Sequence, residues 1–131
     1  MEMSGLLKKE HLPTIVLVET SHSGNVGSVA RAMKTMGLSS LKLVRPKCDP
    51  HAQIAYQMSS GAEDILDNVD VYDTILQSCK KVREVVALSY RKRSIPLPVK
   101  YPREYFDELK SNYSRAFVFG NEQSGLSNSD L

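Results

Sequence analysis

Short runs of β-branched and apolar residues alternate with helix-forming segments along this chain, and that alternation most constrains its fold. The runs predicted to form strands cover residues 14–19, 41–44, 69–72, 84–88 and 115–119. Helices are predicted over 26–36, 51–58, 74–82 and 102–109. Strands that alternate with helices form a mostly parallel sheet with helices on both faces. The sequence therefore predicts an α/β fold.

Capping residues and breakers set the predicted boundaries of these elements. Asn25 is predicted to cap the first long helix and Asp73 the helix after the third strand, because short polar side chains accept bonds from first-turn amides. Pro102 suits the first position of a helix. Residues 59–68 are expected to be irregular, and 89–101 are expected to form a long loop, because Pro96 and Pro98 cannot donate hydrogen bonds to a sheet.

Length and composition indicate one ordinary globular domain spanning 1–131. With 41% hydrophobic and 24% charged residues, the chain is neither disordered nor fibrous in composition. Its longest apolar stretch, 15–18, is far shorter than the roughly 20 residues that span a membrane. Two cysteines without CxxC spacing and no secretory leader favour a cytoplasmic protein, and the three histidines have no metal-ligand spacing, so no metal is expected.

Three loops are expected at the carboxyl ends of the strands, where ligands bind in sheets of this kind: 20–25, 89–101 and 120–126. The first contains Gly24 and Asn25 and leads into the helix 26–36, which carries Gly27, Arg31 and Lys34. Glycines and a helix N-terminus suit a phosphate, which Arg31 and Lys34 could also reach. An ordinary strand-to-helix loop with a solvated arginine is the alternative, and the spacing alone does not separate the two.

The other two loops carry an acid and a basic tract. The stretch FGNEQSGL, 119–126, lacks the glycine patterns of a P-loop or a dinucleotide fold, and Glu122 by itself could be a solvated acid. No GxSxG elbow indicates a hydrolase. Arg91, Lys92 and Arg93, with Tyr90 and Tyr101 nearby, suit the phosphates and stacked bases of RNA. A short charge run can equally be a solvated surface, since the net charge is only +2.

Two segments together resemble a known family. VETSHSGNVGSVARAMKTMGL and FVFGNEQSGL, with YRKRSIPLP between them, are similar to the first two motifs of the SpoU-type RNA 2′-O-methyltransferases, and the match is strongest to members that modify tRNA. The resemblance covers about 14–131. It implies a SPOUT fold with a C-terminal trefoil knot, a homodimer, and methyl transfer from S-adenosylmethionine to a ribose 2′-hydroxyl. The expected target is the pyrimidine at position 32 of the tRNA anticodon loop.

The resemblance also assigns residues by motif. Arg31 matches the catalytic arginine, with Asn25 and Glu122 shaping its surroundings. Positions that match cofactor-binding residues are Leu88, Ser89, Tyr90, Gly120, Gly125 and Leu126, and the expected RNA contacts are Arg31, Lys34, Arg91, Lys92 and Arg93. Leu88 and Tyr90 are bulkier than the small or hydroxyl residues typical of that loop.

The family's third motif has no counterpart before Leu131, so the resemblance implies a C-terminally incomplete chain that lacks the knot-forming segment and is inactive by itself. Two other functions remain open. The same motifs would occur in a family member that methylates rRNA. A module that keeps the fold and binds RNA without the cofactor would also retain much of this pattern.

Overall fold

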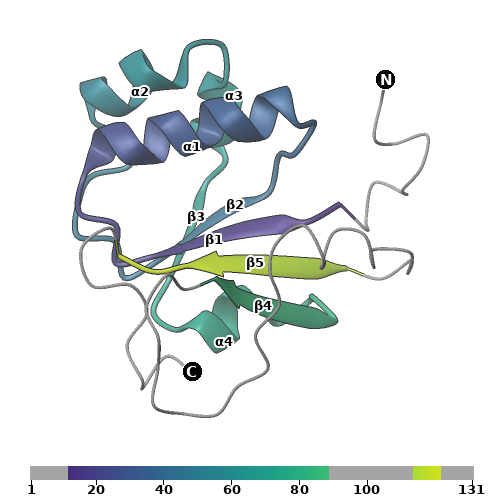
Figure 1. Ribbon diagram of the computed structural model, residues 1–131. Coiled ribbons are helices and arrows are strands. Elements are labelled where there is room, and N and C mark those ends of the chain that lie inside the picture. The colour runs from purple at the N-terminus through teal and green to yellow at the C-terminus, as the bar shows by residue number, and fades with distance from the viewer. Residues whose placement is uncertain (1–11, 89–113, 122–131) are drawn as a thin grey trace.

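The protein, seen in a computed structural model that describes residues 12–88 and 114–121, is built on a five-stranded parallel sheet (Figure 1). Its strands are β1 (Thr14–Val18), β2 (Leu41–Val44), β3 (Asp70–Tyr72), β4 (Glu84–Leu88) and β5 (Arg115–Phe119). They lie in the order β3-β2-β1-β5-β4, and every neighbouring pair is parallel. The predicted strands and the α/β class are confirmed.

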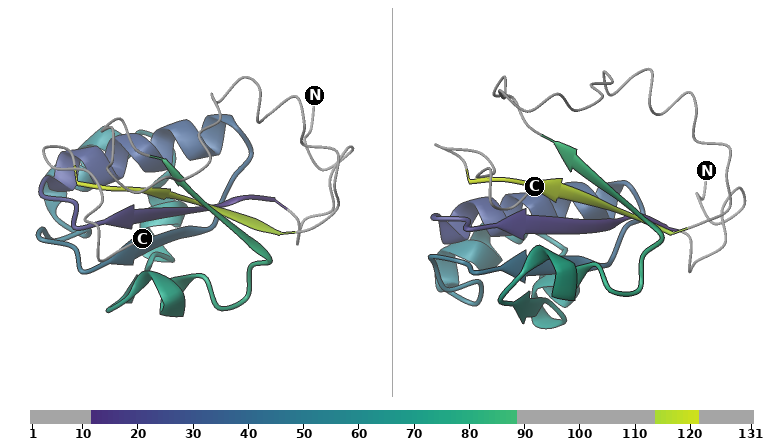
Figure 2. Two further views of the ribbon diagram at one scale, coloured as in Figure 1. Left: turned by 60° about the horizontal axis from the view of Figure 1, so that its bottom comes forward. Right: turned by 90° about the horizontal axis from the view of Figure 1, so that it is seen from below.

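Helices cover both faces of the sheet. The long helix α1 (Ser23–Thr35) lies on one face with α2 (Gln53–Ser59) and α3 (Glu63–Asp67), which pack against it. The short helix α4 (Ile75–Ser78) packs against β1, β2 and β3 on the opposite face, as the view from below in Figure 2 shows. The predicted two-sided covering of the sheet is therefore confirmed.

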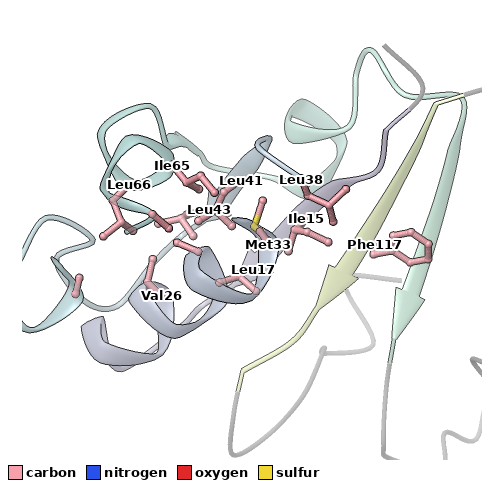
Figure 3. Close-up of a cluster of buried hydrophobic side chains, with 13 residues drawn as sticks. Ile15, Leu17, Val26, Met33, Leu38, Leu41, Leu43, Ile65, Leu66 and Phe117 are labelled. Atoms are coloured by element: carbon pink, nitrogen blue, oxygen red, sulfur yellow. The ribbon is translucent and has the colours of Figure 1, made fainter. Parts of the chain in front are cut away.

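The core is divided in two by the sheet, and β1 contributes to both halves. Ile15 and Leu17 point to the α1 side, where they join Val26, Met33 and other side chains drawn in Figure 3. Val16 and Val18 join the smaller cluster on the α4 side. Every residue of β1 is buried, because the strand has a neighbour at each edge and a layer on each face.

The start of α1 differs from the prediction. The helix begins at Ser23, and its N-cap is His22, which makes no side-chain capping bond. Asn25 lies inside the first turn, so the prediction that it caps the helix is wrong. Tertiary contacts explain the earlier start: the Ser23 hydroxyl donates to the carbonyl of Asp49 at 2.7 Å, and Gly24 lies against the side chains of α2.

Two further boundaries were wrongly predicted. Residues 59–68 contain the helix α3, reached through Ser60 and Gly61 with φ of 34° and 97°. Thr74 rather than Asp73 caps α4, since its hydroxyl accepts from the amide of Gln77 at 3.1 Å, and the helix ends at Ser78. The predicted loop 89–101 and helix 102–109 lie outside the described residues.

No helix in the described ranges is long and apolar enough to cross a membrane. Both cysteines are free, Cys48 half-buried and Cys79 buried. The same ranges hold no cluster of three or more histidine, cysteine or acidic side chains that could bind a metal ion.

Candidate functional site

The carboxyl ends of β1, β5 and β4 lie side by side at one edge of the sheet. Leu17 pairs with Phe119, and Phe119 pairs with Leu88 on its other side. From β1 the chain runs outward through β2 to β3, and then crosses to the opposite edge at β4 before returning to β5 beside β1. The strand order therefore reverses between β1 and β5, the position where parallel sheets of this kind bind ligands.

Asn121 joins the loops that follow these two central strands. Its side chain is 9% exposed, and its Nδ2 donates to the carbonyl of Glu19 at 2.6 Å and lies 2.9 Å from the hydroxyl oxygen of Ser21. Residues about 100 positions apart in the sequence are thus connected by one side chain. We call these two contacts the Asn121 clamp.

Glu19 turns the chain at the end of β1 and organises the charges there. It adopts a left-handed backbone with φ of 55°, and its amide donates to the carbonyl of Val44 at the end of β2. Its carboxylate lies 3.6 Å from the Arg45 guanidinium and 3.2 Å from the Lys47 ammonium. Glu19, Arg45 and Lys47 therefore form a cluster of two cations around one carboxylate at this part of the edge.

The loop after β2 is tied to both of its neighbours. Arg45 also has a left-handed backbone, with φ of 46°, and its guanidinium donates to the carbonyl of Asp73 after β3 at 2.7 Å. The amide of Lys47 donates to the carbonyl of Thr20 after β1 at 2.9 Å. Backbone and side-chain bonds thus connect the loops at the ends of β1, β2 and β3.

The beginning of α1 is held against α2 by a close backbone contact. A Cβ atom on Gly27 would lie 2.0 Å from the carbonyl oxygen of Ala55, so no larger residue fits without a shift of backbone. Val26 and Ala30 are fully buried beside it. This contact orients the exposed positions of α1, among them Asn25 and Arg31.

Arg31 lies two turns into α1 and is exposed. In the described part of the chain its guanidinium has no acidic partner. Lys34, one turn further on, lies 3.1 Å from a carboxylate oxygen of Asp64 in α3, and this hydrogen bond lowers the pKa of Asp64 from its ordinary value. Both groups of the pair are more than half exposed.

Two of the expected cofactor residues are described, and they are neighbours. Leu88 is half-buried at the end of β4 and packs against the core on the α1 side, while Gly120 is half-buried directly after β5. The remaining expected site residues, Ser89, Tyr90, Arg91, Lys92, Arg93, Glu122, Gly125 and Leu126, lie outside the described residues.

Sequence reasoning assigned no role to Asn121 or Glu19. A signal for Asn121 was present, because a polar residue directly after a buried strand of a parallel sheet lies at the ligand-binding edge. Its partners could not be inferred without knowing that β5 pairs with β1. The sequence predicts Glu19 as the last residue of a strand, whereas the structure ends β1 at Val18 and turns the chain at Glu19 through a contact with β2.

Comparison with known proteins agrees with this arrangement. Residues 13–131 match the model of the SpoU rRNA Methylase family. The tRNA (cytidine/uridine-2′-O-)-methyltransferase TrmJ of Escherichia coli is 48% identical over 122 residues, which cover 89% of this chain and 48% of that protein. The chain spans about half the length of the curated relatives it matches.

Solved structures share the fold. The crystal structure of TrmJ from Z. mobilis superposes with a TM-score of 0.85 at 30% identity, covering 92% of this chain and 54% of that one. The SpoU methyltransferase AviRb from Streptomyces viridochromogenes, solved with its cofactor AdoMet, superposes with a TM-score of 0.62 at 16% identity, covering 98% of this chain and 48% of that one. At that identity the likeness shows the fold alone.

Proposed function

This chain belongs to the SpoU rRNA Methylase family, and we propose that its residues 1–131 form the catalytic domain of an enzyme that methylates the ribose 2′-hydroxyl of tRNA. One observation carries the proposal: the two loops that bear the family motifs meet at the reversal of strand order, joined by the Asn121 clamp. The likeness to TrmJ of Escherichia coli supports tRNA as the substrate class.

The described ends of β4 and β5 fit S-adenosylmethionine as the methyl donor. Leu88 and Phe119 are adjacent in register and partly exposed, which offers an apolar surface for an adenine ring. Gly120 follows directly and lets the backbone approach a ligand closely. Ser89, Tyr90, Gly125 and Leu126 are proposed to complete this pocket. When bound, the cofactor would supply an activated methyl group on a sulfonium.

We assign Arg31 the role of an electrostatic clamp on the RNA. A guanidinium stays protonated in proteins and is a poor base, but it binds a phosphate with two parallel hydrogen bonds. Placed beside the reacting ribose, it would stabilise the negative charge that develops on the 2′-oxygen as the proton leaves. Its exposure in α1 leaves it accessible to a large substrate. Asn25 and Glu122 are proposed to shape the same site.

The finer features of the proposal concern the target and the assembly. The proposed nucleotide is the pyrimidine at position 32 of the anticodon loop, held by Lys34, Arg91, Lys92 and Arg93 in addition to Arg31. The enzyme is proposed to act as a homodimer with a knotted C-terminal segment. Both features rest on the family resemblance.

The test is a methylation assay on the whole protein that contains this chain. It is incubated with S-adenosylmethionine and an unmodified tRNA transcript, and the product is mapped by mass spectrometry of nuclease fragments. We expect one added methyl group on the ribose of nucleotide 32, and none on a transcript carrying a 2′-deoxy residue there. Methylation at a different nucleotide would correct the target while keeping the reaction.

A second candidate substrate is rRNA, which the family description itself names. Parallel incubation with ribosomal RNA separates the two, because the tRNA proposal fails if rRNA is methylated and tRNA is not. Calorimetric titration with S-adenosylmethionine tests for a domain that only binds RNA. Absence of cofactor binding by the whole protein would overturn the enzymatic proposal.

A further inference from the structure

We propose that Asn121 is a positioning residue for the methyl transfer: its clamp sets the distance between the donor-binding turn after β5 and the arginine in α1. The inference rests on the proposed function and deepens it. Asn121 itself need not touch either substrate, because its side-chain amide is directed at the loop after β1.

The geometry uses both hydrogens of the amide group. Nδ2 donates one to the Glu19 carbonyl at 2.6 Å, and the other faces the Ser21 hydroxyl oxygen at 2.9 Å. The side chain is 9% exposed, so little water competes for these bonds. The Glu19 carbonyl ends β1 at a left-handed turn, and residues there depend on surrounding contacts to keep that conformation.

The clamp acts on a segment that is short and fixed at its far end. Between Ser21 and the buried Gly27 contact lies less than two turns of α1. The direction of α1 is set by that contact, whereas its entry from the sheet is set by Asn121. Arg31 belongs to this fixed helix, so without the clamp the turn after β5 can shift and Gly120 changes its position relative to the guanidinium.

A displacement of this kind affects rate more than binding. When a reaction needs two groups in line, misplacing the reacting atoms by roughly 1 Å can lower its rate about 100-fold. In the proposed pocket the donor is held by the ends of β4 and β5 and by the loops that follow them, and not by the loop after β1. A positioning role therefore predicts a fall in the rate of transfer at saturation, with little change in cofactor affinity.

The variant Asn121→Asp tests this, because a carboxylate of the same shape cannot donate to the Glu19 carbonyl. In the whole protein we expect the single-turnover rate at saturating S-adenosylmethionine and tRNA to fall about tenfold or more. The dissociation constant for S-adenosylmethionine should stay within a factor of about three. Ser21→Ala keeps the bond to Glu19 and should give a smaller loss, so it serves if Asn121→Asp folds poorly.

Thr14→Val is the matched control. Thr14 lies at the opposite end of β1, is 8% exposed and donates a 3.1 Å bond to the Ser40 hydroxyl. The Thr14→Val variant should lower the melting temperature about as much as Ser21→Ala does, while the single-turnover methylation rate at saturating substrates stays unchanged. An equal fall in rate for Thr14→Val and Ser21→Ala would mean that reduced stability explains both, and the positioning role would be refuted.

Hydrogen exchange separates failure of this inference from failure of the proposed function. Asn121→Asp should lower the protection of the amides in the loop 19–22 whether or not the protein is catalytic. If the wild-type protein methylates no RNA, the proposed function fails and the positioning role fails with it, even where exchange shows an ordered loop. If the enzyme is active and Asn121→Asp keeps the wild-type rate, only the positioning role is overturned.

Discussion

The carboxyl edge of the sheet and the contact between α1 and α2 are built in opposite ways. The helix contact is close and apolar: Gly27 lies directly on the Ala55 carbonyl, between fully buried neighbours. The carboxyl edge is polar, and two of its non-glycine residues, Glu19 and Arg45, have a left-handed backbone. Shape complementarity fixes the first region, whereas individual hydrogen bonds and ion pairs fix the second.

The difference between the two regions indicates that the helix contact serves stability and the carboxyl edge serves ligand binding. A packed helix contact tolerates little change in volume, because its neighbours cannot move apart without giving up favourable packing. A polar edge can exchange one partner for another, including a ligand, while the sheet beneath it stays intact. We therefore expect substitutions at the edge to change activity and substitutions at the helix contact to change stability.

Arg31→Ala should give the largest effect. Removing the proposed clamp on the developing charge is expected to lower the single-turnover methylation rate by about 100-fold or more. Cofactor affinity and melting temperature should not change, because the side chain is exposed. Arg31→Lys keeps the charge without the planar fork and should restore only part of the rate. A wild-type methylation rate in Arg31→Ala would show that Arg31 has no role in the transfer.

Gly27→Ala should test the helix contact. Its new Cβ would meet the Ala55 carbonyl at 2.0 Å, and overpacking of this kind costs about 1–3 kcal/mol of unfolding free energy. Gly24→Ala is the control, since a Cβ there lies 3.5 Å from Ile54 and 3.6 Å from Met58, both flexible side chains. Urea denaturation should show a loss for the first and no loss for the second. Equal stability of the two variants would contradict the close contact.

Replacing Arg91, Lys92 and Arg93 together with alanine should weaken tRNA binding on the order of tenfold at low salt, because fewer counterions are released. The slope of log affinity against log salt should become shallower by about 0.7 for each phosphate that the protein no longer neutralises. Lys80 and Lys81 precede β4 at the other end of the sheet, and their double alanine variant is the control. An unchanged slope in the triple variant would place the RNA elsewhere.

Glu19→Gln should change RNA binding in the opposite direction and by less. Without the carboxylate, the positive charges of Arg45 and Lys47 are no longer partly neutralised, while the backbone hydrogen bonds of the turn are kept. We expect tRNA affinity to rise a few-fold, on the order of one further neutralised phosphate, with a steeper salt dependence. Glu63→Gln in α3 removes the same charge elsewhere and should have no effect. Weaker binding by Glu19→Gln would exclude the edge as an RNA surface.

The pair of Lys34 and Asp64 should give the smallest effect. The bond to Lys34 holds the pKa of Asp64 below its ordinary value of 3.8, so the pair stabilises the fold above that pH. This stability disappears as the pH falls through the lowered pKa. Lys34→Met should therefore lower the melting temperature slightly at neutral pH and not in stronger acid. If Lys34→Met still melted at a lower temperature than the wild type in strong acid, Lys34 would stabilise the fold by a contact other than its ion pair with Asp64.

The strands were predictable from the sequence because they coincide with short runs that contain apolar and β-branched residues, and β1, which is buried on both faces, is the clearest of them. The residues at which the helices begin were harder to predict from the sequence. The five residues of α3 are too few for a helical period to appear, and α1 starts early because Ser23 and Gly24 contact distant segments. The residues that Ser23 and Gly24 contact lie far away in the sequence, so the local pattern cannot indicate the earlier start of α1.

The site was predictable to the level of loops and not of contacts. The alternation of strands and helices predicted that the loops around Gly24 and Gly120 lie at the carboxyl ends of their strands, and the structure places both there, because parallel strands end at the same side of a sheet. The clamp of Asn121 and the charge cluster of Glu19 depend on the strand order. That order brings together residues that local patterns treat separately.

The placement of β5 has a consequence for synthesis on the ribosome. The segment from β1 to α3 contains neighbouring strands and the helices that cover them, so its contacts can form while the rest of the chain is still being made. Until β5 emerges and inserts next to β1, one edge of the central strand stays open. The loops after β1 and β5 are connected only when that pairing forms, and a chain interrupted before residue 121 would lack the contact that holds them together.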